Sequence, residues 1–199
     1  MDIYKTSIEG LMKIKYDEFS DNRGVAAKYF CKELFLNYNI DFEINDLFYS
    51  VSNKDVIRGM HFQTKPFEQE KLIQVMSGEI VDVVLDLRKN SKTFQKYEEF
   101  FLDSKANMAI FVPKGCAHGF KALTDNTIVM YAISNQYSKE NDKGIRWNSF
   151  GYDWGSIKPV ISMKDEKLIT MSEYCNTLNN HYIRRKKWLN IYVDFVAEN

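Results

Sequence analysis

Two of the three histidines in this chain lie in short motifs that suggest a binding site. His61 stands in Val-Ile-Arg-Gly-Met-His-Phe-Gln, residues 56–63, with Arg58 three positions before it and Gln63 two positions after it. His118 stands in Pro-Lys-Gly-Cys-Ala-His-Gly-Phe, which leads from a turn into a predicted strand. Histidine transfers protons near pH 7 and also binds metals. The neighbouring cation and amide favour a functional role for His61, and the glycine between Arg58 and His61 permits close approach of the backbone.

The pair of motifs resembles a cupin barrel, in which two short motifs face one another across the interior. Metal-binding cupins place His-x-His and a carboxylate in the first motif and a third histidine in the second. Here the first motif offers only His61, and Gln63 stands at the position of the second histidine. Two imidazoles without a suitably placed carboxylate make a poor site for a divalent ion. We therefore expect no metal and no cofactor.

The elements that must position these residues are predicted to be strands. Between residues 70 and 135 the apolar runs are short, rich in β-branched residues and separated by turn signals. This spacing indicates an all-β fold, an antiparallel jelly-roll or cupin barrel with a few short, mainly C-terminal helices. In residues 80–87, Asp82 and Asp86 alternate with apolar residues, which predicts a half-buried strand. The apolar runs cover residues 72–76, 80–87, 108–112 and 128–133.

The two ends of the chain show helical rather than strand-like spacing of apolar residues. Residues 25–36 carry apolar residues at helical spacing and predict a short helix. After about residue 156 the pattern becomes more helical. We expect one domain over residues 1–175 and a helical extension over residues 176–199, which either packs on the barrel through Trp188, Tyr192 and Phe195 or is partly flexible.

Composition excludes several classes of function. The 199 residues contain 27 Lys and Arg and 27 Asp and Glu, so no net charge attracts nucleic acid or an anionic membrane. The start of the chain lacks the pattern of a signal peptide, and no apolar stretch is long enough to span a membrane. Three widely spaced cysteines suggest neither disulfides nor a zinc site. We expect a cytoplasmic protein without a nucleic-acid or membrane partner.

Six segments together resemble the dTDP-4-dehydrorhamnose 3,5-epimerase family, in the family's order and spacing. The resemblance covers roughly residues 10–170. It implies a cofactor-independent isomerase, acting as a homodimer on a nucleoside-diphosphate 4-keto-6-deoxy sugar in the biosynthesis of a deoxysugar for surface polysaccharide. The matching segments are VIRGMHFQ (56–63), KLIQVMSGEIVDVVLDLRKNSKTF (71–94), FVPKGCAHGF (111–120), KGIRWN (143–148), GYDW (151–154) and SMKD (162–165).

The resemblance also implies roles for individual residues. A proton on C3 or C5 of such a sugar lies next to the C4 ketone, so its removal gives an enolate. His61 matches the family's base, and Asp165 matches the carboxylate that pairs with it. Lys71 matches the cation near the keto oxygen, and Tyr131 matches the phenol that returns a proton from the other face. A further set matches the substrate-binding positions, namely Arg23, Arg58, Gln63, His118, Asp46 and Phe48.

This sequence departs from the family mainly around the pocket rather than at the four chemical positions. Arg23 keeps its place in Asp-x-Arg-Gly, but the family's next residues, two phenylalanines and a glutamate, are replaced. Asp46 and Phe48 stand where the family has glutamine and asparagine, and Ala132 replaces the lysine after the catalytic tyrosine. A carboxylate without a neighbouring cation or hydroxyl repels an anionic substrate. Phenylalanine in place of asparagine removes an amide that could form hydrogen bonds. We expect a changed substrate: another nucleotide base (GDP or CDP), a heptose, or inversion at a single carbon.

Two other functions are compatible with the sequence. A 3,4-ketoisomerase of the same barrel type would use a similar base but has less need of an acid on the opposite face, so Tyr131 speaks against it. A catalytically silent sugar-nucleotide-binding barrel would have no reason to carry the base, its carboxylate partner, the cation and the phenol together. The sequence favours the epimerase over both.

Overall fold

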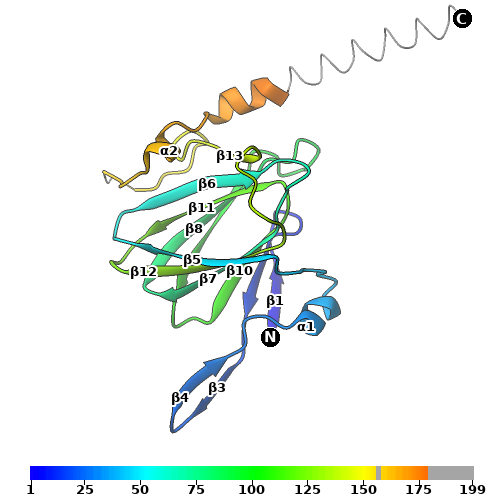
Figure 1. The fold of residues 1–199 in the computed structure, drawn as a ribbon, viewed down its shortest axis with the longest axis vertical. Coiled ribbons are helices and arrows are strands. Elements are labelled where there is room, and N and C mark those ends of the chain that lie inside the picture. The colour runs from blue at the N-terminus through cyan, green and yellow to red at the C-terminus, as the bar shows by residue number, and fades with distance from the viewer. Residues whose placement is uncertain (156–157, 179–199) are drawn as a thin grey trace, which may run out of the picture.

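The computed structural model describes residues 1–155 and 158–178, which form two antiparallel sheets facing one another (Figure 1). The six-stranded sheet has the order β1-β2-β10-β7-β12-β5, and the five-stranded sheet has the order β13-β6-β11-β8-β9. In the first sheet the strands are β1 (Asp2–Lys5), β2 (Met12–Lys15), β10 (Met108–Val112), β7 (Lys71–Ser77), β12 (Thr127–Ile133) and β5 (Asp46–Ser52). In the second they are β13 (Asp142–Gly144), β6 (Ile57–Gln63), β11 (Cys116–Ala122), β8 (Glu79–Asp86) and β9 (Tyr97–Asp103). The predicted antiparallel barrel is confirmed.

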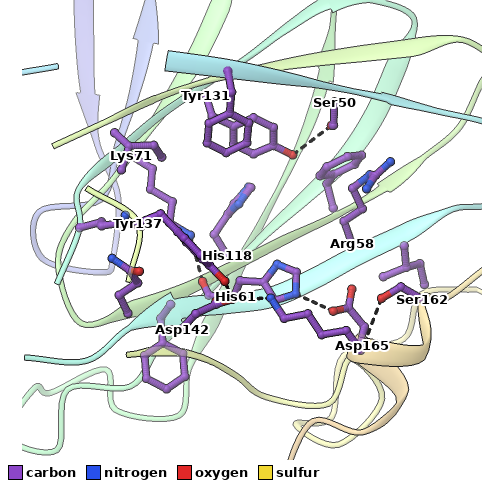
Figure 2. A pocket seen from close by; sticks show the side chains of 18 of the residues that line it. Ser50, Arg58, His61, Lys71, His118, Tyr131, Tyr137, Asp142, Ser162 and Asp165 are labelled. Carbon is purple, nitrogen blue, oxygen red and sulfur yellow. Dashed lines mark hydrogen bonds and ion pairs between the residues drawn. The ribbon is translucent and has the colours of Figure 1, made fainter. Parts of the chain in front are cut away.

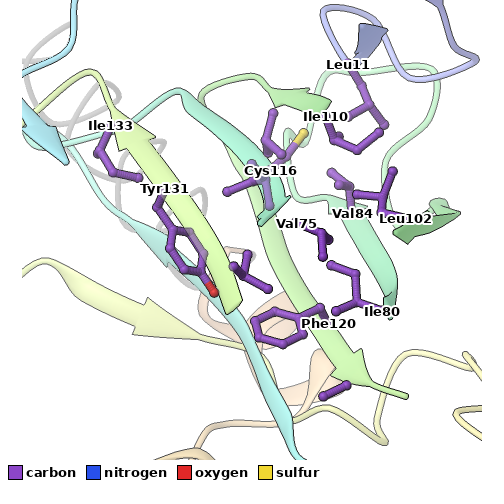
Figure 3. Packing of buried hydrophobic residues seen from close by; sticks show 14 of the residues in the cluster. Leu11, Val75, Ile80, Val84, Leu102, Ile110, Cys116, Phe120, Tyr131 and Ile133 are labelled. Carbon is purple, nitrogen blue, oxygen red and sulfur yellow. The ribbon is translucent and has the colours of Figure 1, made fainter. Parts of the chain in front are cut away.

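All four predicted apolar runs are strands: they lie in β7, β8, β10 and β12, shifted by no more than one residue at either end. Between the sheets, branched side chains of these strands form the main core, in which Val75 and Val84 from opposite sheets share one cluster with Ile110 and Phe120 (Figure 3). Burial of this apolar surface is the main term that stabilises the barrel.

The prediction that β8 is half-buried was wrong. Asp82 and Asp86 are both fully buried, because their face of the strand points into the barrel with Ile80 and Val84. The opposite face is covered by the segment after β13 and by residues 171–175. Each carboxylate has a partner inside the protein, as buried charges require: burial alone would raise the pKa of Asp86, but hydrogen bonds from Arg88 and neighbouring hydroxyls lower it to about 2.

The predicted helix over residues 25–36 was also largely wrong. Residues Gly24–Ala27 form strand β4, which pairs with β3 (Glu18–Asp21) in a hairpin that extends away from the barrel (Figure 1). Gly24 adopts a φ of +126° in the turn, a conformation that favours glycine. The helix α1 spans only Lys32–Asn37 and buries Phe35 against the outer face of the six-stranded sheet. Pairing within the hairpin overrides the local helical spacing of its two alanines.

The C-terminal part supplies two short helical elements, one beside the barrel interior and one on the outer face of the five-stranded sheet. The helix α2 spans Met163–Glu166, and Ser162 caps it by accepting a hydrogen bond from the Asp165 N–H. Residues 171–178 are helical and begin with a capping box between Thr170 and Glu173. The predicted domain boundary at residue 175 falls inside this helix, and the predicted terminal helix with Trp188 lies outside the described residues. No helix in the described ranges is long and apolar enough to cross a membrane.

Candidate active site

A cavity of about 580 Å³ opens between the two sheets (Figure 2). The six-stranded sheet lines it with side chains from β5, β7 and β12, and the five-stranded sheet with side chains from β6 and β11. The loop before β13 and the segment around α2 close one side. Of the ten residues given roles from the sequence, nine line this cavity. The nine are Asp46, Phe48, Arg58, His61, Gln63, Lys71, His118, Tyr131 and Asp165.

His61 and Asp165 form the most direct contact in the cavity. Nε2 of His61 lies 2.7 Å from Oδ1 of Asp165, although the two residues are 104 positions apart in the chain. Asp165 is buried, and its second oxygen accepts a hydrogen bond from the Gly59 N–H at 3.3 Å. Burial alone would raise the pKa of Asp165, but the hydrogen bonds from His61 and Gly59 lower it. An ionised carboxylate fixes the proton on Nε2, so Nδ1 of His61 is the ring nitrogen available to take up a proton.

Gly59 is the residue that lets β6 approach β11 closely enough for this arrangement. Its φ is +130°, and a Cβ atom built on it would lie 2.5 Å from the Cα of Gly119 on β11. A side chain therefore cannot be accommodated without moving the backbone that carries His61 and His118, which face each other across the two strands. The prediction that this glycine permits close backbone approach is confirmed.

Lys71 is a buried cation at the first residue of β7. Its side chain is 8% exposed, and Nζ donates a hydrogen bond to the backbone carbonyl of His61 at 3.1 Å. Within the described part of the chain, no carboxylate lies within ion-pair distance of Nζ. Burial lowers the pKa of Lys71 to about 8, while the charges of Asp142 and Asp82 partly oppose this shift. Such a lysine can stabilise negative charge that develops in the cavity.

Tyr131 lies on the six-stranded sheet, so the cavity separates it from His61 on the five-stranded sheet (Figure 2). Its hydroxyl lies 3.4 Å from Oγ of Ser50, and its ring stacks on the ring of Phe48. Burial raises the pKa of Tyr131 above that of a free phenol. The hydroxyl therefore stays protonated near neutral pH and can donate a proton.

The other predicted binding residues differ in how many of their hydrogen-bonding groups already bond within the protein. The guanidinium of Arg58 donates to Oγ of Ser52 and to the backbone of β5, both at 3.0 Å. His118 is buried and bonds Asp82 at 2.6 Å. The amide of Gln63 is occupied by the backbone of residues 67, 136 and 138, so it holds the loop beside the cavity. Asp46 lines the cavity beside Ile133, which is the register partner of both Asp46 and Lys71.

Arg23 is the one predicted site residue that the fold does not bring to the cavity of its own chain. It lies in the exposed turn between β3 and β4 and pairs with Asp21. This hairpin extends away from the barrel, on the side opposite to α2 (Figure 1). Within a single chain, the guanidinium has no contact with the base or the phenol.

Sequence reasoning missed one phenol and two charged residues that line the cavity, namely Tyr137, Asp142 and Lys164. Lys164 forms an ion pair with Asp142, and the hydroxyl of Tyr137 donates to the same carboxylate at 3.2 Å. Sequence reasoning also missed Asp82 as the buried partner of His118, which itself lines the cavity. Two signals were present: Lys164 directly precedes Asp165 in a matching segment, and Asp82 is a charged residue within an apolar strand. Among the described residues, no group of three or more histidines, cysteines and carboxylates is placed to hold a metal.

Comparison with known proteins identifies the family. The family model for dTDP-4-dehydrorhamnose 3,5-epimerase matches residues 5–173. This chain belongs to the dTDP-4-dehydrorhamnose 3,5-epimerase family. It is therefore an isomerase with the barrel fold of these nucleotide-sugar epimerases, as the sequence predicted.

Individual family members agree with this assignment. The dTDP-4-dehydrorhamnose 3,5-epimerase of Escherichia coli is 35% identical over 179 residues, covering 87% of this chain and 96% of its own. The crystal structure of the Bacillus anthracis enzyme with TDP and pyrophosphate bound is 35% identical, with a TM-score of 0.83 over 85% of this chain and 99% of its own. A 3'-monoepimerase from Streptomyces bikiniensis in complex with dTDP-quinovose is 28% identical, with a TM-score of 0.81 over 87% and 89%. The family's fold therefore includes enzymes that differ in how many carbons they invert.

Proposed function

We propose that this enzyme inverts one or both carbons next to the C4 ketone of a nucleoside-diphosphate 4-keto-6-deoxy sugar, in the biosynthesis of a deoxysugar. The observation that carries the proposal is the placement of three groups around one cavity: the His61–Asp165 pair on one side, the protonated phenol of Tyr131 on the other, and the buried ammonium of Lys71 at its wall. These are the groups that carbon inversion through an enolate requires.

In the first step, Nδ1 of His61 takes the proton from the carbon next to the ketone. The electron pair of the broken C–H bond moves onto the C4 oxygen and gives the enolate, and His61 becomes an imidazolium. Asp165 stabilises that imidazolium, because its carboxylate stays ionised and bonded to Nε2. The charge of Lys71 lowers the energy of the enolate oxygen.

In the second step, the hydroxyl of Tyr131 gives its proton to the same carbon from the opposite face. The enolate electrons re-form the C4 ketone, and the carbon is now inverted. The phenolate recovers a proton from solvent, and the imidazolium of His61 releases one. The raised pKa of Tyr131 makes the phenolate short-lived, so the tyrosine is protonated again before the next turnover.

The cavity wall carries two residues that bear on the choice of substrate, Asp46 and Phe48. Asp46 and Phe48 place a carboxylate and a ring at the cavity, at positions where the resemblance described above implies amide side chains. A carboxylate facing an anionic ligand is stabilised only if the ligand supplies a hydrogen-bond donor. This supports a substrate that differs from the dTDP sugars named for the family's members.

The test is deuterium incorporation from heavy water. The enzyme is incubated with 4-keto-6-deoxy hexoses and heptoses carrying dTDP, GDP or CDP, and NMR locates deuterium at C3 and C5. We expect incorporation with inversion for at least one of these sugars. Incorporation at one carbon identifies a single epimerase, and incorporation at both identifies a double one. No incorporation with any sugar of the panel would reject the proposed function.

Replacement of Tyr131 by phenylalanine separates the two steps. The variant retains the His61–Asp165 pair, so the proton next to the ketone still exchanges with solvent from one face. We expect inversion to slow by roughly 10²-fold or more, while exchange in the recovered substrate persists. The measurement is NMR of both sugars after incubation in heavy water. Equal slowing of exchange and inversion would show that Tyr131 is not the acid of the second step.

We also propose that the enzyme is a homodimer in which the hairpin of each chain serves the cavity of its partner. Two observations support this. The hairpin carries Arg23 away from its own cavity. The outer face of β5, an edge strand, exposes three large apolar side chains, which favours association. These side chains are Leu47, Tyr49 and Val51.

Mixing two defective chains tests the exchange of hairpins. We expect Arg23→Ala to weaken substrate binding and His61→Ala to lower turnover by roughly 10²- to 10⁴-fold. Sedimentation velocity should show that each variant is a dimer. In a mixed dimer, one cavity combines the intact His61 of one chain with the intact Arg23 of the other. Refolding the two variants together should therefore produce more activity than either alone. Unchanged activity in verified mixed dimers would place Arg23 outside the partner's cavity.

A further inference from the structure

Phe48 faces Tyr131 directly across the β5–β12 pair. The two residues are register partners, and their ring centroids lie 4.7 Å apart with an interplanar angle of 13°. This separation is within the range of stacked aromatic pairs. Both residues also line the cavity, and Figure 2 shows the ring of Tyr131 there. Phe48, on the edge strand β5, therefore packs against one face of the phenol ring and restrains its orientation.

Tyr131 also packs in the main core cluster, and its two other contacts with polar or aromatic groups at the cavity are weaker than the stack. The hydroxyl lies 3.4 Å from Oγ of Ser50, which is long for a hydrogen bond between two oxygens. The ring of His118 approaches edge-on at 6.2 Å. Neither contact restrains rotation of the phenol ring as a parallel ring against its face does. Phe48 is itself 47% exposed, whereas Tyr131 belongs to the main core cluster, so the stack lies where the core meets the cavity wall.

We infer that Phe48 is a positioning residue that keeps the hydroxyl of Tyr131 aimed at the substrate carbon, and so sets how often each enolate is inverted. This inference rests on the proposed function. Phe48 forms no bond to the reacting atoms in the mechanism and acts through the orientation of Tyr131.

The enolate has two ways to regain a proton, and Phe48 affects only one of them. When Tyr131 donates from the opposite face, the carbon is inverted and the phenolate later takes a proton from solvent. When the imidazolium of His61 returns a proton to the original face, the sugar is unchanged, apart from any deuterium that has entered from heavy water. Misalignment of Tyr131 slows the first route and leaves the second intact. The ratio of exchange to inversion therefore reports the orientation of the phenol.

The experiment measures this ratio in Phe48→Leu, which keeps an apolar side chain and removes the ring. Deuterium in the recovered substrate is compared with the amount of inverted product, using a sugar that the wild-type enzyme inverts. We expect the ratio of exchange to inversion to rise about threefold to tenfold, the change that loss of one aromatic stack allows. Phe48→Tyr keeps the stack and should restore the wild-type ratio. Phe101→Leu removes an exposed ring on β9, outside the cavity, and should leave the ratio unchanged.

The outcomes separate this inference from the proposed function. A wild-type enzyme that exchanges no deuterium overturns the function and the inference together. A wild-type enzyme that inverts its sugar, with a Phe48→Leu variant of unchanged ratio, overturns the inference alone. An equal loss of exchange and inversion also overturns it, because Phe48 would then serve binding or folding. If Phe48→Leu is recovered unfolded, Phe48→Met supplies the ring-free side chain for the same comparison.

Discussion

His61→Ala is expected to lower both inversion and deuterium exchange by roughly 10²- to 10⁴-fold, the contribution of a positioned general base. Both reactions begin with the same proton abstraction, so both depend on Nδ1 of this histidine. The residue lies beside the cavity and not in the core, so the variant should fold, but the buried Asp165 loses its side-chain donor and the unfolding temperature should fall modestly. Exchange is followed by NMR in heavy water and unfolding by calorimetry.

Two controls distinguish a base from a residue that only shapes the cavity. Added imidazole should partly restore exchange in His61→Ala, because a free base can enter the space left by the side chain. Asp165→Asn keeps the shape of the pair but removes the charge that fixes the tautomer and stabilises the imidazolium. We expect this variant to lose activity while the imidazole ring remains. Turnover of His61→Ala within a few-fold of wild type would remove His61 from the mechanism.

Lys71→Met is expected to move activity and stability in opposite directions. The substitution removes the charge that stabilises the enolate oxygen, which should lower turnover by roughly 10²- to 10³-fold. It also relieves the burial of an ammonium group that forms no ion pair within the described residues. The lowered pKa of about 8 measures that burial, so the free energy of unfolding should rise at neutral pH, on the order of 1–3 kcal/mol.

The buried ammonium group of Lys71 also makes stability and activity depend on pH. The pKa of Lys71 is about 8 in the folded protein and 10.5 in a free side chain, so between these values the unfolded chain binds more protons. The contribution of Lys71 therefore makes the wild-type protein more stable as pH rises through this interval. Activity should fall over the same interval, because the neutral amine no longer stabilises the enolate. Lys71→Met should lose both trends.

A second buried lysine provides the matched control for Lys71. Lys121 is 6% exposed and donates a hydrogen bond to the backbone of Trp154, outside the cavity. Lys121→Met removes the same group from the interior and should leave turnover unchanged, as measured with the wild-type substrate. A loss of turnover equal to that of Lys71→Met would show that the effect comes from folding and not from the enolate.

Local pattern was sufficient to locate the strands and most of the candidate site. Short apolar runs rich in β-branched residues, bounded by turn signals, marked the four central strands, and alternation in residues 80–87 added the period of a strand for one of them. The segments around His61, Lys71 and His118 carried enough specific residues to indicate the family. The role of the glycine between Arg58 and His61 was also predictable, because a glycine within a strand often marks close approach of another backbone.

The tertiary structure decided which faces are covered and which distant residues meet. Alternation marks Asp82 and Asp86 as sharing a face, but only the second sheet turns that face into the interior of a barrel. Residues 25–36 have helical spacing, but residues 25–27 belong to the β3–β4 hairpin, whose strand pairing is set by the turn at Gly24. Likewise, the stack of Phe48 on Tyr131 depends on the register of two strands 83 residues apart. Local periodicity can be recognised from neighbouring residues in the sequence. Contacts across the cavity join residues far apart in the chain, so they depend on how the whole chain folds.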